Sequence, residues 1–289
     1  MKVDLILTSD WHLRETVPVC RTDDFWTVQW VKVEYIHTLQ RQYGCPVLHA
    51  GDLYHHWKPS PYLTSHTIDY IPNDFWTVYG QHDLPQHNLN LRQKSGIHVL
   101  HRANRAHVLV GTHWGEEVMR ESFSVPHKNG ARNILVWHHM VWQGRRPYPG
   151  CTDPSSIAVL KKYSDYDLIL TGDNHRPFVE EYDGRVLVNP GPITRQSADE
   201  THAPRVYLYN AERNTVWPEY IPYTKDAVSR VHLEERIERE GRIDAFISKL
   251  QGEWEAGLSF EENLKRFFSA NKIREATLEI INQSLEHEG

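Results

Sequence analysis

Cysteine is scarce in this chain. The 289 residues include three cysteines, Cys20, Cys45 and Cys151, and none of them belongs to a CxxC pair. An odd number of widely spaced cysteines argues against a disulfide framework and against a thiolate zinc site. Any metal ion bound here must therefore be held by histidine, carboxylate or amide groups.

Long apolar runs and a surplus of basic residues are also absent. No stretch approaches the roughly 18 consecutive apolar residues of a membrane span, and residues 1–6 lack the features of a secretory signal peptide. We therefore expect a cytoplasmic protein. The 32 Lys and Arg stand against 38 Asp and Glu, a formal net charge of −6. This balance gives no electrostatic argument for a nucleic-acid substrate, although bound metal ions would add positive charge.

Histidine, by contrast, is abundant. The chain has 19 histidines, of which 15 lie at or before His139. Hydrophobic residues make up 39% of the chain and charged residues 24%, values typical of a globular protein with a sizeable core. The histidine surplus in a chain poor in cysteine is the first indication of a metal site.

Short β-rich runs alternate with helical patterns over residues 1–224, which predicts a layered α/β domain. Helices are expected over residues 23–42 and 153–163, the second with Asp153 as cap and Pro154 in the first turn. From about residue 225 to 289 the strand patterns stop, and we expect a helical C-terminal extension of two to four helices. Strands are expected over residues 3–8, 46–50, 75–79, 106–111, 133–137, 167–171, 179–182, 186–188 and 206–209.

Polar side chains follow five of the expected strands at the point where each strand ends. Ligand sites of open α/β sheets assemble at the carboxyl ends of strands, where the loops converge. Such a series supplies the seven or eight oxygen and nitrogen ligands that two metal ions about 3.5–4 Å apart require. The residues concerned are Asp10 and His12, Asp52, Gln81, His82 and Asp83, His138 and His139, and Asp173 and His175.

These motifs resemble those of the calcineurin-like metallophosphoesterases, whose pattern runs D-x-H, GD, GNH[D/E], H and GHxH on successive strand ends. Within that superfamily the sequence is most similar to the Mre11/SbcD nucleases. The similarity extends to residues 52–55 (DLYH) with 58–60 (KPS), to residues 171–177 (TGDNHRP) and to residues 189–195 (NPGPITR). It covers roughly residues 1–220 and implies a layered α/β/β/α sandwich with a C-terminal helical appendage.

Two residues depart from the family pattern. Gln81 stands where the family has Asn, and Asp173 stands where it has the first His of GHxH. Both can still ligate a metal ion through oxygen, but Gln is one methylene longer than Asn. The position or occupancy of the metal on that side is therefore in question.

The resemblance implies that one metal ion is held by Asp10, His12 and His175 and that Asp52 bridges to a second. The second ion would be held by Gln81, His138 and Asp173, a harder and more negative set than in the usual pattern. That set favours Mn²⁺ over zinc, with Mg²⁺, Zn²⁺ and Fe²⁺ as alternatives. His138 is favoured over His139 as the ligand, because the family ligates through the first His after the strand.

Further roles follow from the same resemblance. His82 is the candidate general acid, since imidazole can donate a proton near neutral pH. His55 would contact the phosphate, and Asp83 either orients His82 or caps the turn that follows. Candidates for binding the substrate are His139, Trp142, Arg145 and Arg176.

The sequence therefore predicts a two-metal phosphodiesterase, a DNA nuclease of the Mre11/SbcD kind. Two alternatives stay open: an enzyme acting on a small nucleotide or cyclic nucleotide, and a scaffold that has lost catalysis through Gln81 and Asp173. The C-terminal helices could pack back on the core. They could instead dock an ATPase subunit, as in the nucleases that the sequence resembles.

Overall fold

We describe a computed structural model of residues 2–109, 112–118, 123–252 and 258–270. The chain divides into two compact units, residues 1–229 and 230–289. In the second unit the structure describes two helices, α5 (Val231–Gly252) and α6 (Phe260–Ala270). Any helix expected after residue 270 lies outside the described residues. None of the described helices has the length and apolar character needed to cross a bilayer.

Two sheets form the centre of the first unit. The larger has the strand order β11-β10-β1-β2-β3-β4 and the smaller the order β5-β6-β7-β9-β8. Strands β1 to β4 run parallel to one another, as do β6, β7 and β9. The larger sheet comprises β1 (Leu5–Thr8), β2 (Val47–His49), β3 (Phe75–Thr77), β4 (His107–Val108), β10 (Arg205–Asn210) and β11 (Thr215–Tyr220). The smaller comprises β5 (Phe123–His127), β6 (Gly130–Trp137), β7 (Leu168–Thr171), β8 (Phe178–Tyr182) and β9 (Arg185–Asn189).

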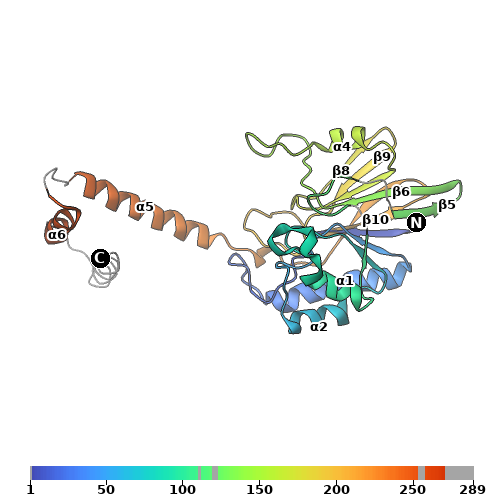
Figure 1. The fold of residues 1–289 in the computed structure, drawn as a ribbon, viewed down its shortest axis with the longest axis horizontal. Coiled ribbons are helices and arrows are strands. Elements are labelled where there is room, and N and C mark those ends of the chain that lie inside the picture. The colour runs from blue at the N-terminus through green and yellow to red at the C-terminus, as the bar shows by residue number, and fades with distance from the viewer. Residues whose placement is uncertain (1, 110–111, 119–122, 253–257, 271–289) are drawn as a thin grey trace. The chain divides into compact units, whose positions relative to one another are not determined.

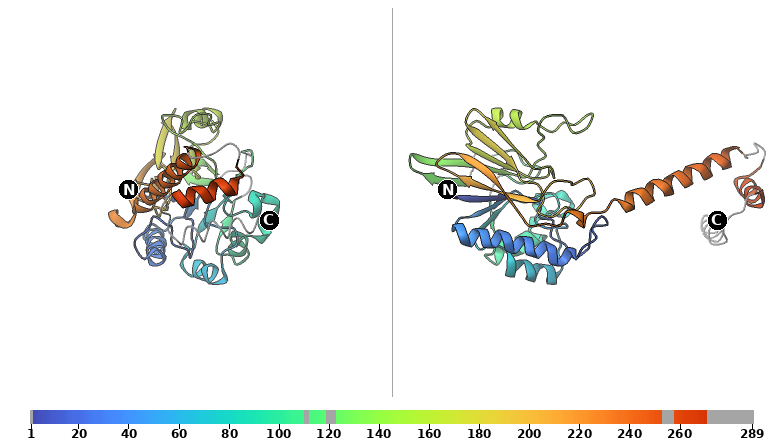
Figure 2. Two further views of the ribbon diagram at one scale, coloured as in Figure 1. Left: turned by 90° about the vertical axis from the view of Figure 1, so that its left-hand side faces the viewer. Right: turned by 180° about the vertical axis from the view of Figure 1, so that it is seen from behind.

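Helices cover the outer faces of both sheets. Figure 1 shows α1 (Phe25–Tyr43) and α2 (Pro61–Tyr70) on one side of the sheets and α4 (Ser156–Lys162) on the other, and the reverse view in Figure 2 agrees. Helix α3 (Gly96–Arg102) and the short 3-10 turns η1 (Pro85–His87), η2 (Leu89–Lys94) and η3 (Lys225–Ala227) complete the unit. The expected α/β/β/α sandwich is thus confirmed.

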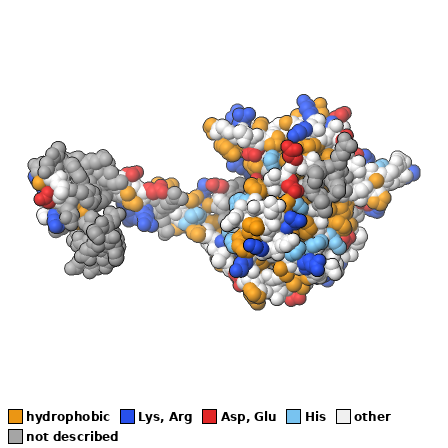
Figure 3. All heavy atoms as spheres, viewed as in Figure 1, with side chains coloured by type: hydrophobic (Ala, Val, Ile, Leu, Met, Phe, Trp, Pro, Cys, Tyr) orange, Lys and Arg blue, Asp and Glu red, His pale blue; other side chains and the backbone are white. Residues whose placement is uncertain are grey.

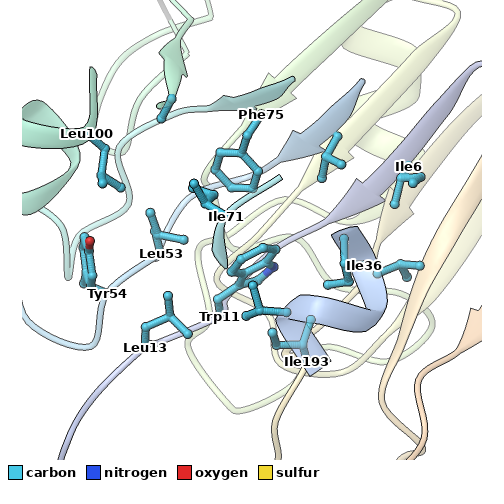
Figure 4. Packing of buried hydrophobic residues seen from close by; sticks show 14 of the residues in the cluster. Ile6, Trp11, Leu13, Ile36, Leu53, Tyr54, Ile71, Phe75, Leu100 and Ile193 are labelled. Carbon is cyan, nitrogen blue, oxygen red and sulfur yellow. The ribbon is translucent and has the colours of Figure 1, made fainter. Parts of the chain in front are cut away.

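Three apolar clusters hold these layers together, because each sheet buries one face against the other sheet and one against helices. Leu7 and Leu48 of the larger sheet pack with Val136 and Leu170 of the smaller. The cluster under α1 and α2 contains Trp11, which points into the core among Ile36, Phe75 and Ile193 in Figure 4. A third cluster, including Trp137 and Val159, lies under α4.

Sequence patterns located most elements but misplaced or missed some. The expected start of α4 was wrong: the cap is Ser155, whose side chain accepts the Ala158 N–H. Residues 154–156 instead pair with Trp142, and this extended backbone delays the helix. Strands β5 and β11 and helices α2 and α3 were not predicted. Strand β11 is partly exposed and contains a proline, which weakens an alternating pattern.

Candidate metal centre

The centre lies where the carboxyl ends of parallel strands from the two sheets meet. Asp10 follows β1 and Asp52 follows β2, whereas His138 follows β6 and Asp173 follows β7. Hydrogen bonds join the sheets here: the Asp173 N–H donates to Asp10 Oδ1 over 3.0 Å, and His138 Nδ1 donates to the Ala50 carbonyl over 2.6 Å. The structure therefore brings together polar groups separated by up to 165 residues of sequence.

The backbone of the centre adopts an uncommon conformation. Asp10, His12, Asp52 and Asp173 have φ values of 52°, 48°, 57° and 71°, in the left-handed region that side chains other than glycine seldom occupy. Such residues persist where the surrounding structure fixes them, and they gather at functional sites. Gly51 is required for a related reason, since a Cβ there would lie 2.5 Å from His138 Nδ1.

The first half of the centre consists of Asp10, His12 and His175, which we call the first ligand group. The Nε2 atoms of His12 and His175 face one another at 3.1 Å. Asp10 Oδ2 is buried and has no hydrogen-bond partner. One ligand atom from each of the three residues lies within 4.8 Å of the others, a spacing that a single metal ion can span.

Asp52 lies between the two halves. Its Oδ2 atom is 3.8 Å from His12 Nε2, 3.5 Å from His138 Nε2 and 4.0 Å from His82 Nε2. One carboxylate oxygen thus faces three imidazoles that come from separate strand ends. This is the arrangement expected of a bridging ligand.

His138, Gln81 and Asp173 form the other half, which we call the second ligand group. Gln81 Oε1 lies 2.6 Å from His138 Nε2, and Gln81 Nε2 donates to Asp173 Oδ1 over 2.6 Å. The amide of Gln81 therefore connects the other two members directly. His139 turns away and stacks on Trp137, with ring centroids 4.1 Å apart.

Glu200 supports the first ligand group, a role that the sequence did not indicate. Its Oε1 accepts a hydrogen bond from His175 Nδ1 at 2.6 Å, and its Oε2 accepts the Gln196 N–H at 2.6 Å. The Gln196 side chain in turn donates to the carbonyl of His12. A carboxylate on the outer nitrogen of a ligating imidazole fixes its orientation and raises its basicity.

Asp83 shapes the backbone around Asp52. Its buried carboxylate accepts N–H groups from Asp52, Leu53, Tyr54 and Gly80 at 2.8–3.3 Å. The orientation of His82 has another source, since its Nδ1 donates to the His55 carbonyl at 2.9 Å. Asp83 thus neither contacts the His82 ring in this structure nor caps a helix.

His82 and His55 lie at the open side of the centre. The His82 side chain is 40% exposed, and its ring stacks with that of His55 at 5.5 Å. Ligand atoms of His12, His55 and His82 also fall within 4.8 Å of one another. Burial lowers the pKa of His55 to about 4, so its ring is neutral near pH 7.

The remaining candidates occupy less central positions. Trp142 is fixed by its Nε1, which donates to the Asp153 carbonyl over 2.8 Å. Arg145 lies in an exposed loop, and Arg176 is exposed directly after His175. Part of the histidine surplus lies outside the centre, since His87 and His107 are exposed residues of η1 and β4. Figure 3 shows histidine side chains on the surface.

The electrostatics of the centre favour bound positive charge. Burial opposes protonation of His138, but Asp52 and Asp10 outweigh it and raise the pKa of His138 to about 10. Burial likewise opposes protonation of His175, but Glu200 and Asp10 raise the pKa of His175 to about 9. The carboxylates therefore retain protons on the buried His138 ring and the partly buried His175 ring, positive charge that a metal ion would replace.

These residues fit a divalent metal pair. The unpaired oxygen of Asp10, the facing nitrogens of His12 and His175 and the central oxygen of Asp52 are a donor set of nitrogen and oxygen. A family model described as the calcineurin-like phosphoesterase superfamily domain matches residues 3–212. The chain belongs to that superfamily. Its members' chemistry supports a hydrolase that acts on phosphate esters.

Comparison with solved structures finds similar chains at low identity. An archaeal phosphodiesterase is 15% identical with a TM-score of 0.41, covering 75% of this chain and 99% of that one. A single mutant of Vps29 from Entamoeba histolytica is 14% identical with a TM-score of 0.39, covering 76% and 99%. A putative 5′-nucleotidase from Staphylococcus aureus is 14% identical with a TM-score of 0.46, covering 81% and 58%. No curated protein matches the chain significantly.

Proposed function

We propose that this calcineurin-like phosphoesterase is a two-metal phosphodiesterase that cleaves DNA, a nuclease of the Mre11/SbcD kind. The observation that carries the hydrolytic part is the central Oδ2 of Asp52, which faces His12, His82 and His138 within 4.0 Å. The nuclease part rests on the resemblance of residues 52–55, 171–177 and 189–195 to that family.

Asp10, His12 and His175 would hold one metal ion, and Gln81, His138 and Asp173 the other, with Asp52 shared. When bound, the pair would lower the pKa of a water molecule and offset the negative charge of the phosphate. Mn²⁺ suits a donor set with carboxylate and amide oxygens on the second side. The imidazole-rich first side would suit Zn²⁺ or Fe²⁺, and Mg²⁺ is an alternative for the oxygen-rich second side; all three are to be titrated.

His82 is placed to move a proton. Because its Nδ1–H is fixed on the His55 carbonyl, Nε2 is the atom that gains and loses the proton. That atom lies 4.0 Å from Asp52 Oδ2, and the His82 side chain is 40% exposed, so the ring is accessible to a leaving group at the centre. The neutral ring of His55, stacked beside it, can donate a hydrogen bond to a phosphate oxygen.

The test is an assay of the purified protein with Mn²⁺ on end-labelled single-stranded DNA, double-stranded DNA, RNA and cyclic nucleotides. Asp52→Ala should abolish cleavage, whereas Asp69→Ala, at an exposed residue of α2, should leave it unchanged. DNA fragments in the product ladder support the proposal. Intact DNA under conditions in which bis(p-nitrophenyl) phosphate is hydrolysed would contradict the nuclease assignment.

A second candidate is a phosphodiesterase for small nucleotides or cyclic nucleotides. The net charge of −6 favours it, because a protein that binds a long polyanion usually presents a basic face. The same assay separates the two, since this candidate would cleave cyclic nucleotides and leave DNA intact. Failure to hydrolyse bis(p-nitrophenyl) phosphate with any divalent ion would instead indicate a scaffold without catalysis.

We also propose that the C-terminal helices dock an ATPase subunit, as the resemblance implies. Removal of residues 225–289 tests this. A soluble, active core that no longer binds its partner supports docking, whereas an insoluble core would show that these helices pack on the catalytic unit.

A further inference from the structure

A pocket of about 560 Å³ opens beside the first ligand group. The turn after β7 and the segment that leads into β10 form its walls. His175 and Glu200 belong both to the metal centre and to this wall, so the pocket adjoins the centre directly. We call it the His175 pocket. Its remaining wall includes Arg176, Ser197 and Arg205.

Two guanidinium groups give the His175 pocket its chemistry. Arg176 is exposed, and Arg205 is held in place by a hydrogen bond from its Nε to the Ala203 carbonyl and by the Tyr220 ring, 4.8 Å away. Within the described part of the chain, no carboxylate lies within ion-pair distance of either group. Both can therefore accept an anion from outside.

Two acidic side chains in the wall, Glu200 and Asp199, oppose the attraction of the guanidinium groups for an anion only weakly. Both oxygens of Glu200 are already engaged, one by His175 Nδ1 and one by the Gln196 N–H. Asp199 is the other acidic residue in the wall and is exposed to solvent, which screens its charge. Guanidinium groups bind phosphate through paired, charge-assisted hydrogen bonds.

The pocket offers a nucleobase little surface for stacking. No Phe, Tyr or Trp is among the described residues that line it, and the aromatic rings there are the imidazoles of His175 and His202. Hydroxyl groups of Ser197 and Thr201 and the two guanidinium groups suit a sugar phosphate instead.

We propose that the His175 pocket binds a second phosphate group of the substrate, adjacent to the ester that is cleaved. The inference rests on the proposed function, because a phosphodiester has two substituents and the pocket adjoins the metal centre at His175 and Glu200. The substrate class is therefore a nucleotide with at least two phosphates, such as a stretch of nucleic acid. An ester with a single phosphate would leave the pocket without its ligand.

The test compares equilibrium binding of thymidine 3′,5′-bisphosphate with that of the two thymidine monophosphates, by calorimetry in the presence of Mn²⁺. The bisphosphate should bind about tenfold or more tightly than either monophosphate, the gain expected from one charge-assisted contact. Arg176→Ala and Arg205→Ala should each reduce this preference. Arg102→Ala, at an exposed arginine of α3, should retain it.

Equal binding of bisphosphate and monophosphates would overturn the inference, and so would a preference that survives in both variants. Hydrolysis of bis(p-nitrophenyl) phosphate is measured in parallel. Hydrolysis of the ester without a preference for the bisphosphate overturns the inference about the His175 pocket and leaves the proposed function standing. A preference that depends on Arg176 and Arg205 in a protein that does not hydrolyse the ester overturns the proposed function and supports the pocket as a phosphate site.

Discussion

The two ligand groups of the metal centre differ in how their donor atoms are engaged. In the first group the Nε2 atoms of His12 and His175 face each other and Asp10 Oδ2 has no partner, while Glu200 fixes the His175 ring from behind. The members of the second group are hydrogen-bonded to one another: Gln81 contacts His138 with one amide atom and Asp173 with the other.

This difference has a consequence for metal binding. Asp10 Oδ2 is buried and unpaired, so it gains the full benefit of a cation, and the first group has one hydrogen bond to lose, the one between His12 Nε2 and His175 Nε2. The second group has two to lose, from Gln81 to His138 and from Gln81 to Asp173. We therefore expect the first ligand group to bind Mn²⁺ more tightly than the second. The longer side chain of Gln81 is the feature that separates them.

His82→Asn should have the largest effect on turnover among these single substitutions and should leave metal binding by both ligand groups unchanged. Loss of the proton donor should lower turnover about 10²- to 10⁴-fold while the metal content measured by elemental analysis stays the same. His87→Asn, at an exposed histidine of η1, is the matched control and should be fully active. Loss of both metal ions from His82→Asn would show that His82 is structural.

Glu200→Gln should weaken Mn²⁺ binding by the first ligand group and leave binding by the second unchanged. Without the carboxylate on His175 Nδ1, the affinity of the tighter Mn²⁺ site should fall about 10- to 100-fold. Calorimetric titration with Mn²⁺ measures this, and Glu181→Gln on the exposed part of β8 serves as the control. Equal weakening of both sites would count against the assignment of Glu200 to the first ligand group.

Gln81→Asn should reduce the difference in Mn²⁺ affinity between the two ligand groups. The shorter amide cannot span from His138 to Asp173, so the second group loses its internal hydrogen bonds and its Mn²⁺ affinity should rise by about tenfold. The same titration reports the change. A lower Mn²⁺ affinity at the weaker site would contradict this. It would mean that the Gln81 oxygen contributes more to metal binding as a ligand than its hydrogen bonds to His138 and Asp173 take away.

Lys32→Met should have the smallest effect on metal binding, because Lys32 contacts the backbone of Ile193, outside both ligand groups. Its Nζ donates to the Ile193 carbonyl at 2.7 Å, and burial, with Arg21 and Arg195 nearby, lowers its pKa to about 7. Between pH 7 and its unfolded pKa near 10.5 the unfolded chain binds more protons, so stability rises with pH there. Relative to Lys32→Met, the free energy of unfolding should rise by at most about 1.4 kcal/mol per pH unit.

Denaturant titrations of both proteins at pH 6.5 and pH 9 measure this difference. Parallel behaviour of the two proteins would show that Lys32 is charged throughout. Mn²⁺ binding should stay within about twofold in Lys32→Met, because the variant changes no ligand and no hydrogen bond of Glu200.

Local patterns predicted the strand ends well, because buried strands such as residues 168–171 carry continuous apolar runs and the ligands follow them directly. Glu200 could not be found this way, since it lies in a loop and meets His175 only through the fold. The same holds for the four N–H groups that converge on Asp83 and for the contact of Gln81 with Asp173. A linear motif records residue types but not which donor each side chain meets.

A calorimetric titration of the metal-free protein with Mn²⁺ tests most directly whether the two ligand groups differ in Mn²⁺ affinity. We predict two sequential sites whose affinities differ by about tenfold or more. The tighter site should be weakened by Glu200→Gln, and the weaker site should be strengthened by Gln81→Asn. Two sites of equal affinity, each insensitive to these substitutions, would contradict it.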